Sequence, residues 1–141
     1  MTARLLLIAA LSGLVVGCGD DESATAPTTT TPTVTTVTYT GTIDPGGSRF
    51  YSFTNSAAGS VTAFLASVTP ADGRVPLALA LELGIGIPAG TGCATTTTQV
   101  VAPGLATQMT ASLAAGVFCL RVADAGELRG PISFAVRFSH P

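Results

Sequence analysis

Hydrophobic and polar residues alternate with a period of two over most of the chain after residue 33, which is typical of β-strands. Every second residue between Leu77 and Leu83 is leucine, and apolar residues alternate with small or charged ones between Ile132 and Phe138. Clusters of glycine, proline and aspartate separate these runs and indicate turns. The strands predicted are 34–43, 49–53, 60–68, 77–83, 97–101, 105–111, 117–122 and 132–138, and no segment predicts a helix.

Seven or eight short strands indicate an all-β fold. We expect an antiparallel β-sandwich, because a single open sheet would leave one face or one edge exposed. On the strand that ends at Val122, Phe118, Leu120 and Val122 share one face. The glycine-rich stretch 84–92 is expected to be a plain loop, because it lacks the GxxxxGK[ST] pattern of a phosphate loop and Pro88 would interrupt any following helix.

The N-terminal segment has the three parts of an export signal: Arg4, an apolar run over 5–16, and the small residue Gly17. The run is shorter than the roughly 20 residues needed to cross a bilayer. Cys18 follows directly, so the segment resembles a bacterial lipoprotein signal. That resemblance implies cleavage after residue 17, diacylglycerol on the Cys18 thiol and a stable membrane anchor. The alternative is an uncleaved or ordinarily cleaved signal with a chance cysteine.

The chain then changes character, and we expect three parts: a signal peptide 1–17, a lipidated tether 18–37 and one domain 38–141. The tether is acidic and then rich in Thr and Pro, without an apolar period, so it reads as a solvated spacer. Gly19 after the cysteine favours the outer membrane or cell surface in a Gram-negative cell. Charged residues make up only 10% of the chain and none is lysine, so we expect no nucleic-acid partner.

Cys93 and Cys119 remain once Cys18 is assigned to lipid. An even pair outside the reducing cytosol is most simply a disulfide. The alternative, a redox or metal pair, lacks a CxxC spacing and a nearby histidine. No EF-hand or zinc pattern is present in the sequence, so we expect no metal and no cofactor.

Five segments together resemble the bacterial pre-peptidase C-terminal domain. They are Tyr39 to Ile43, Arg49 to Phe53, Ala58 to Thr62, Leu77 to Leu83 and Leu113 to Val122. The most specific are Tyr51-Ser52-Phe53 and Ala115 to Val122, where Phe118 stands at the family's usual tyrosine. The resemblance spans roughly 38 to 139 and implies a jelly-roll-like sandwich that accompanies secreted hydrolases and aids secretion, adhesion or folding. Val75-Pro76 stand where the family has acidic residues, so calcium binding is not expected.

Candidate chemistry in the sequence is sparse. The single histidine, His140, is expected in a frayed C-terminal tail, which leaves no partner for a Ser/His/Asp or Cys/His nucleophile. Asp44, Asp72 and Asp124 stand near glycine in turn sequences. Glu82 is expected to face solvent or to pair with an arginine of a neighbouring strand.

These observations predict an extracytoplasmic lipoprotein that is not an enzyme. The first hypothesis is a binding or adhesion module of the cell envelope, anchored to the membrane through lipid, whose partner is an envelope protein, a peptide or a polysaccharide. The alternative is a structural or assembly accessory of the envelope or of a secreted hydrolase, with no ligand of its own. The sequence predicts no ligand-binding residues.

Overall fold

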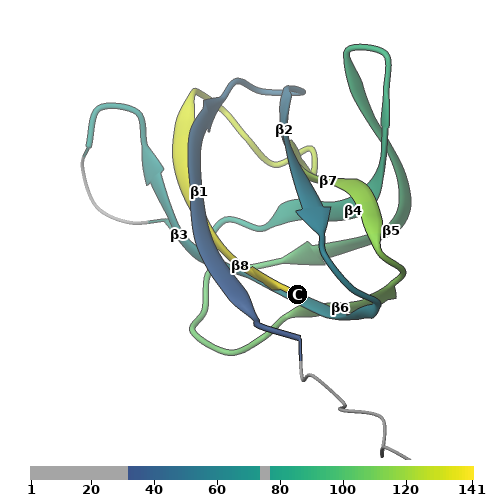
Figure 1. Cartoon of the computed structure of the whole chain (residues 1–141). Coiled ribbons are helices and arrows are strands. Elements are labelled where there is room, and N and C mark those ends of the chain that lie inside the picture. The colour runs from purple at the N-terminus through teal and green to yellow at the C-terminus, as the bar shows by residue number, and fades with distance from the viewer. Residues whose placement is uncertain (1–31, 74–76) are drawn as a thin grey trace, which may run out of the picture. The chain divides into compact units, whose positions relative to one another are not determined.

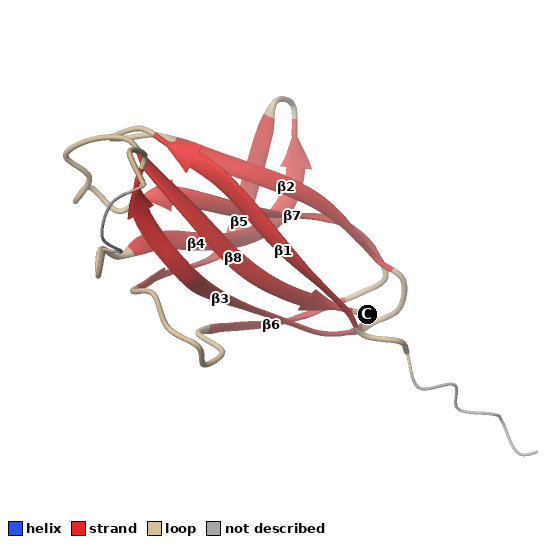
Figure 2. Ribbon diagram, turned by 90° about the vertical axis from the view of Figure 1, so that its left-hand side faces the viewer, coloured by secondary structure: helices blue, strands red, loops and turns tan. Residues whose placement is uncertain are grey.

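Eight antiparallel strands make up the described part of the chain, which contains no helix (Figure 2). The structure is a computed structural model that describes residues 32–73 and 77–141, within the unit Thr31–Pro141. The strands are β1 (Thr35–Ile43), β2 (Ser48–Asn55), β3 (Gly59–Pro70), β4 (Leu81–Ala89), β5 (Gly92–Val101), β6 (Met109–Leu113), β7 (Gly116–Asp124) and β8 (Ile132–His140).

The strands pair from the two ends of the domain inward: β1 with β8, β2 with β7, β3 with β6 and β4 with β5. This long antiparallel ribbon folds over to give two four-stranded sheets, ordered β1-β8-β3-β6 and β2-β7-β4-β5 (Figure 1). The order is that of a jelly-roll sandwich. The predicted antiparallel all-β fold is therefore confirmed.

The hydrophobic core lies between the two sheets. Successive side chains of a strand point to opposite faces, so every second residue is buried. On β8, Phe134, Val136 and Phe138 are buried. The ring of Phe138 meets the ring of Phe53 from β2 at a centroid distance of 4.5 Å, which joins the two sheets.

The C-terminus takes part in this packing, and the expected frayed tail is wrong. His140 is the last residue of β8, and its half-buried ring lies 5.3 Å from the ring of Phe53 and 5.6 Å from that of Phe138 between centroids. The carbonyl of Pro141 accepts a hydrogen bond of 3.0 Å from the Ser56 amide. The alternation of apolar and polar residues that predicted this strand ends at Phe138, so it could not predict the contacts of His140 and Pro141.

The strand predicted at 77–83 is displaced in the structure. β4 begins at Leu81 and continues to Ala89, through most of the stretch that we expected to be a loop. Residues 77–80 lie outside any strand. Leu77 and Leu79 still pack against the core. Their alternate spacing therefore indicated burial correctly, although the segment does not form a strand.

The starts of β5 and β6 also differ from the prediction. The predictions for the first 31 residues lie outside the part of the chain that the structure describes. β5 starts at Gly92, before the predicted 97–101, and β6 starts at Met109, later than the predicted 105–111. β1 begins at Thr35, inside the predicted tether segment. Cys18, the signal peptide and Val75-Pro76 lie outside the described residues. Within 32–73 and 77–141 there is no helix long and apolar enough to cross a membrane.

Candidate functional site

The outer surface of the sheet β1-β8-β3-β6 is covered by serine and threonine side chains, and we call it the hydroxyl face. It consists of Thr36, Thr38, Thr40, Thr42, Ser60, Thr62, Ser67, Thr69, Thr110, Ser112, Ser133 and Ser139. These residues alternate along their strands with the more buried, core-facing positions. Because the core already fixes which face points inward, the hydroxyl groups are left on the solvent side.

Strand register arranges these hydroxyl groups in rows across the sheet. One row crosses all four strands, from Thr36 through Ser139 and Thr62 to Thr110. The Thr36 and Ser139 hydroxyl oxygens are 2.8 Å apart and hydrogen-bonded. Neighbouring strands lie roughly 4.8 Å apart, so each row presents donors and acceptors at regular intervals.

A shallow groove of about 390 Å³ crosses part of the hydroxyl face. It is lined by Thr40, Gly41, Thr42, Ser67, Thr69, Ser133, Phe134 and Ala135. Ala135, with only a methyl group, lies in the row between Thr40 of β1 and Ser67 of β3, which keeps the floor low there. The hydroxyl groups of Thr42 and Ser133 lie 3.4 Å apart at one end. The groove therefore offers several hydroxyl groups from three strands to one ligand.

A β-bulge in β3 helps to form this groove. The pairing with β8 shifts between Leu65 and Ser67, so Ala66 has no opposite residue. A bulge of this kind bends a strand and increases its local twist. It also brings Ser67 opposite Ala135, where the hydroxyl group lines the groove.

Next to the groove, the same face carries one charged residue and one aromatic ring. Arg137 of β8 lies between Thr38 of β1 and Phe64 of β3 in the strand register. Arg137 is exposed and has no ion-pair partner among the described residues. Phe64 is half-buried, and its neighbours Ala63 and Leu65 point into the core, so its ring lies on the outer side. We did not predict Phe64 from the sequence, although its place in an alternating run between two core positions was the available signal.

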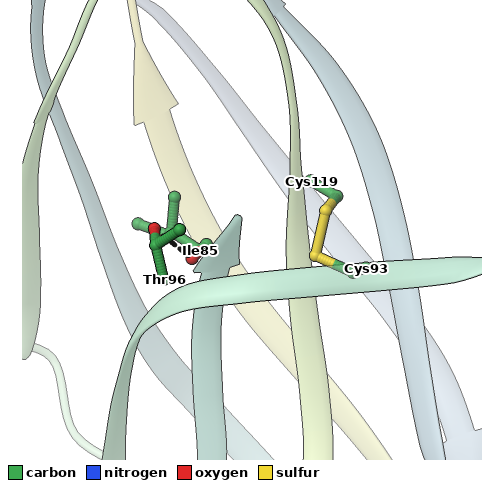
Figure 3. The surroundings of a disulfide bond; sticks show 4 residues. All are labelled: Ile85, Cys93, Thr96 and Cys119. Atoms are coloured by element: carbon green, nitrogen blue, oxygen red, sulfur yellow. Dashed lines mark hydrogen bonds between the residues drawn. A yellow bond between two sulfur atoms is a disulfide. The ribbon is translucent and has the colours of Figure 1, made fainter. Parts of the chain in front are cut away.

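The opposite sheet has a different outer surface, and it holds the predicted disulfide. Cys93 and Cys119 are joined, with 5.9 Å between their Cα atoms, which confirms the predicted pairing (Figure 3). Cys93 lies on β5 and Cys119 on β7, and β4 runs between these two strands in the sheet. The bond therefore holds the start of β5 over β4.

Glycines in β4 make this close approach possible. A Cβ atom at Gly86 would overlap the backbone of Ala94 and Thr95, and one at Gly84 would lie 2.6 Å from the Thr95 methyl group. A bulge at Thr96 turns the strand, and its hydroxyl group donates to the Ile85 carbonyl at 3.2 Å (Figure 3). The glycine-rich stretch is thus a strand over which β5 bends, and its hairpin end projects from the sandwich (Figures 1 and 2).

Glu82 forms the expected ion pair with an arginine of a neighbouring strand. The Glu82 carboxylate accepts a hydrogen bond of 2.7 Å from Arg121 of β7. Each side chain is about one third exposed, at 31% and 32%. The pair occupies the outer surface of β4 and β7, and both charges are neutralised there.

A cluster of hydrogen bonds around Asp124 closes one open side of the sandwich. Asp124 accepts hydrogen bonds from the Gly46 amide at 2.8 Å and from the amides of Gly126, Glu127 and Leu128. These backbone hydrogen bonds, of which that from Gly46 has the largest effect, lower the pKa of the Asp124 carboxyl below its usual 3.8. Asp124 thus ties the β1–β2 turn to the β7–β8 loop, beyond the local turn expected for it.

Tyrosines seal the side where β1 meets β2. The rings of Tyr39 and Tyr51 stack at a centroid distance of 4.5 Å, and the Tyr51 hydroxyl group donates to the Thr40 carbonyl at 2.8 Å. Burial raises the pKa of both phenols. Arg49 also donates to the Thr42 carbonyl at 3.0 Å, so side chains of β2 occupy the unpaired edge of β1.

The sequence matches no protein-family model and no curated protein. The likeness to the pre-peptidase C-terminal domain and to bacterial lipoproteins therefore stays a prediction. Within the described ranges, no group of three or more His, Cys, Asp or Glu side chains is arranged to hold a metal ion. The hydroxyl face, with Arg137 and Phe64, is the candidate site.

Proposed function

We propose that this chain is a membrane-anchored extracytoplasmic lipoprotein whose β-sandwich is a non-catalytic module for binding or adhesion at the cell envelope. The observation that carries this proposal is the hydroxyl-lined groove on an exposed sheet face. Such a surface suits ligands that exchange many neutral hydrogen bonds, such as polysaccharides and extended peptides. The Cys93–Cys119 disulfide fits an oxidising compartment.

The N-terminal pattern supports the anchor. In this proposal Cys18 carries the lipid, the Thr/Pro segment spaces the domain from the bilayer, and β1 begins the folded module. An extended spacer reaches up to about 3 Å per residue. The module would then be held near the membrane with its outer faces accessible to envelope polymers.

Membrane anchoring and ligand binding are tested separately. Mass spectrometry of the N-terminal peptide should show diacylglycerol on Cys18, and Cys18→Ala should release the protein from sedimented membranes. An intact leader peptide, or unchanged membrane retention of Cys18→Ala, would contradict the anchor.

Binding is tested with the full lipidated chain in detergent on polysaccharide and peptide arrays. We expect signals that decrease in the double variant Thr40→Val/Thr69→Val, which removes two groove hydroxyl groups. Thr97→Val is the matched control, because Thr97 is an exposed threonine on β5 of the other sheet. Equal binding by all three proteins would exclude the groove as the site.

The alternative, an assembly accessory without a ligand, is favoured by the edge of β5. This ten-residue strand is at the edge of its sheet and contains neither a charge nor a proline, the residues that usually block edge-to-edge pairing. Blank arrays, together with self-association of the full chain that Thr97→Lys abolishes, would support this alternative.

A further inference from the structure

We propose that the hydroxyl face binds an acidic polysaccharide, with the carboxylate of a uronic acid unit held by Arg137 and the sugar ring packed on Phe64. This inference rests on the proposed function, because it names the ligand class of the same site. It is carried by the distribution of charge on the face, by the position of the outward-facing ring and by the direction of the groove.

The charge on the face is of one sign. Arg137 is the only Asp, Glu, Lys or Arg residue in β1, β3, β6 and β8. The chain as a whole has a formal net charge of −2, so a sheet whose single ionic group is an unpaired arginine stands apart from the rest. On the other sheet, by contrast, Arg121 is neutralised by Glu82. An exposed guanidinium group among neutral hydroxyl groups is complementary to the carboxylate of one uronic acid unit, while the serine and threonine side chains around it are complementary to the hydroxyl groups of the sugars.

Phe64 supplies the second part of the site. The strand register places it beside Arg137 in the same row. Its ring makes no contact with another aromatic ring among the described residues and does not belong to the buried cluster of the core. An apolar ring on a face of hydroxyl groups gives no stability through the core, but it offers a surface for the C–H groups of a sugar ring. Phenylalanine, which lacks the hydroxyl group of tyrosine, presents an entirely apolar ring for this contact.

The groove continues from this row along the strands. The next row contains Thr40, Ala135 and Ser67, and the one after it contains Thr42, Ser133 and Thr69. From Arg137 to Ser133 the strand advances four residues, roughly 13 Å, which is longer than one sugar unit. A chain running in this direction would place its carboxylate at Arg137 and the hydroxyl groups of the following unit against those of the groove. A free monosaccharide would contact either Arg137 or the groove, but not both.

The test compares two polymers that differ only in charge. The full lipidated chain is placed in phosphatidylcholine vesicles, and its binding to polygalacturonate is measured by interferometry against the carboxyl-reduced form of the same polymer. We expect the carboxyl-reduced polymer to bind at least tenfold more weakly. Arg137→Gln should weaken polygalacturonate binding about tenfold, because it removes one charge-assisted pair.

Further variants separate the parts of the site. Arg137→Lys should give an intermediate loss, because it keeps the charge without the two-pronged geometry. Phe64→Leu should weaken the binding of both polymers. Arg129→Gln, at an exposed arginine in the β7–β8 loop, is the matched control and should bind as the unchanged chain does.

Three outcomes would overturn the inference. The first is equal binding of the two polymers with loss in Thr40→Val/Thr69→Val, which would leave the proposed binding function intact with a neutral ligand. The second is an equal loss in Arg129→Gln and Arg137→Gln, which would indicate attraction to any cation on the surface. The third is no binding of polygalacturonate while other array ligands bind. Circular dichroism of each variant verifies the fold.

Discussion

Removal of the Cys93–Cys119 disulfide should destabilise the sandwich strongly. The perturbation is the paired substitution Cys93→Ala/Cys119→Ala, which leaves no unpaired thiol. The bond closes a loop with a sequence separation of 26 residues. In the chain-entropy description, such a loop corresponds to about 3.5 kcal/mol of unfolding free energy at 25 °C.

The location of the bond adds to this effect. Cys119 is fully buried, so the alanine leaves a small void beside β4. The bond also holds β5 over Gly84 and Gly86, where no side chain from β4 supports it. For a domain of this size, about 3.5 kcal/mol corresponds to a decrease in melting temperature of roughly 15 °C.

The assay is thermal unfolding by circular dichroism, with and without a dithiol reductant. The reductant should lower the melting temperature of the unchanged chain toward that of the double variant and should not affect the variant. Hydrogen exchange should increase first at residues 92–96 of β5. A melting temperature that stays within 2 °C in the double variant, or an unmodified Cys119 thiol in the purified unchanged chain, would refute the reasoning.

Three further changes test other contacts. Tyr51→Phe should cost about 1 kcal/mol in a denaturant titration, because the Thr40 carbonyl loses its hydrogen bond. Gly86→Ala should cost about 1 to 3 kcal/mol, because the added methyl group overlaps the backbone of β5. The pKa of Asp124 is lower in the folded chain, so its charge stabilises the fold above pH 3.8 and this contribution is lost as the pH falls through the folded value; the stability difference from Asp124→Asn should therefore shrink in acid.

Two of these changes have a control variant, and the third has a result that would contradict it. Gly130→Ala should alter the melting temperature little, because nothing lies within 4 Å of a Cβ atom there. Tyr39→Phe keeps the stacking of the two rings and tests whether the effect of Tyr51→Phe comes from its hydroxyl group. A constant difference between the unchanged chain and Asp124→Asn from pH 7 to pH 2 would contradict the assigned ionisation.

The alternation of residues was enough to predict the fold class and most strands. It works for β8 because one face is buried over the whole strand. It fails for β4, where the glycines that resemble a loop instead allow another strand to approach. Leu77 and Leu79 show the converse case, in which side chains at strand spacing are buried in a segment without strand pairing.

The candidate site depends on information that the sequence pattern does not contain. Thr36 and Ser139 are neighbours across 103 positions of sequence, and their contact follows from the register of β1 on β8. The bulge after Leu65 decides which β3 residues reach the groove. The disulfide was predictable because the number of cysteines and the predicted export constrain the pairing without any knowledge of register.

The outside-in pairing of the strands has a consequence for how the domain folds. Among the strands that pair with each other, only β4 and β5 are joined by a two-residue turn, so this hairpin can form early, while each surrounding pair closes a longer loop. β8 is synthesised after the other seven described strands and lies between β1 and β3. Until its nine residues arrive, β1 has no neighbour in its sheet and the groove has no floor. We therefore expect the groove to form only after β8 has been synthesised, later than the β4–β5 hairpin.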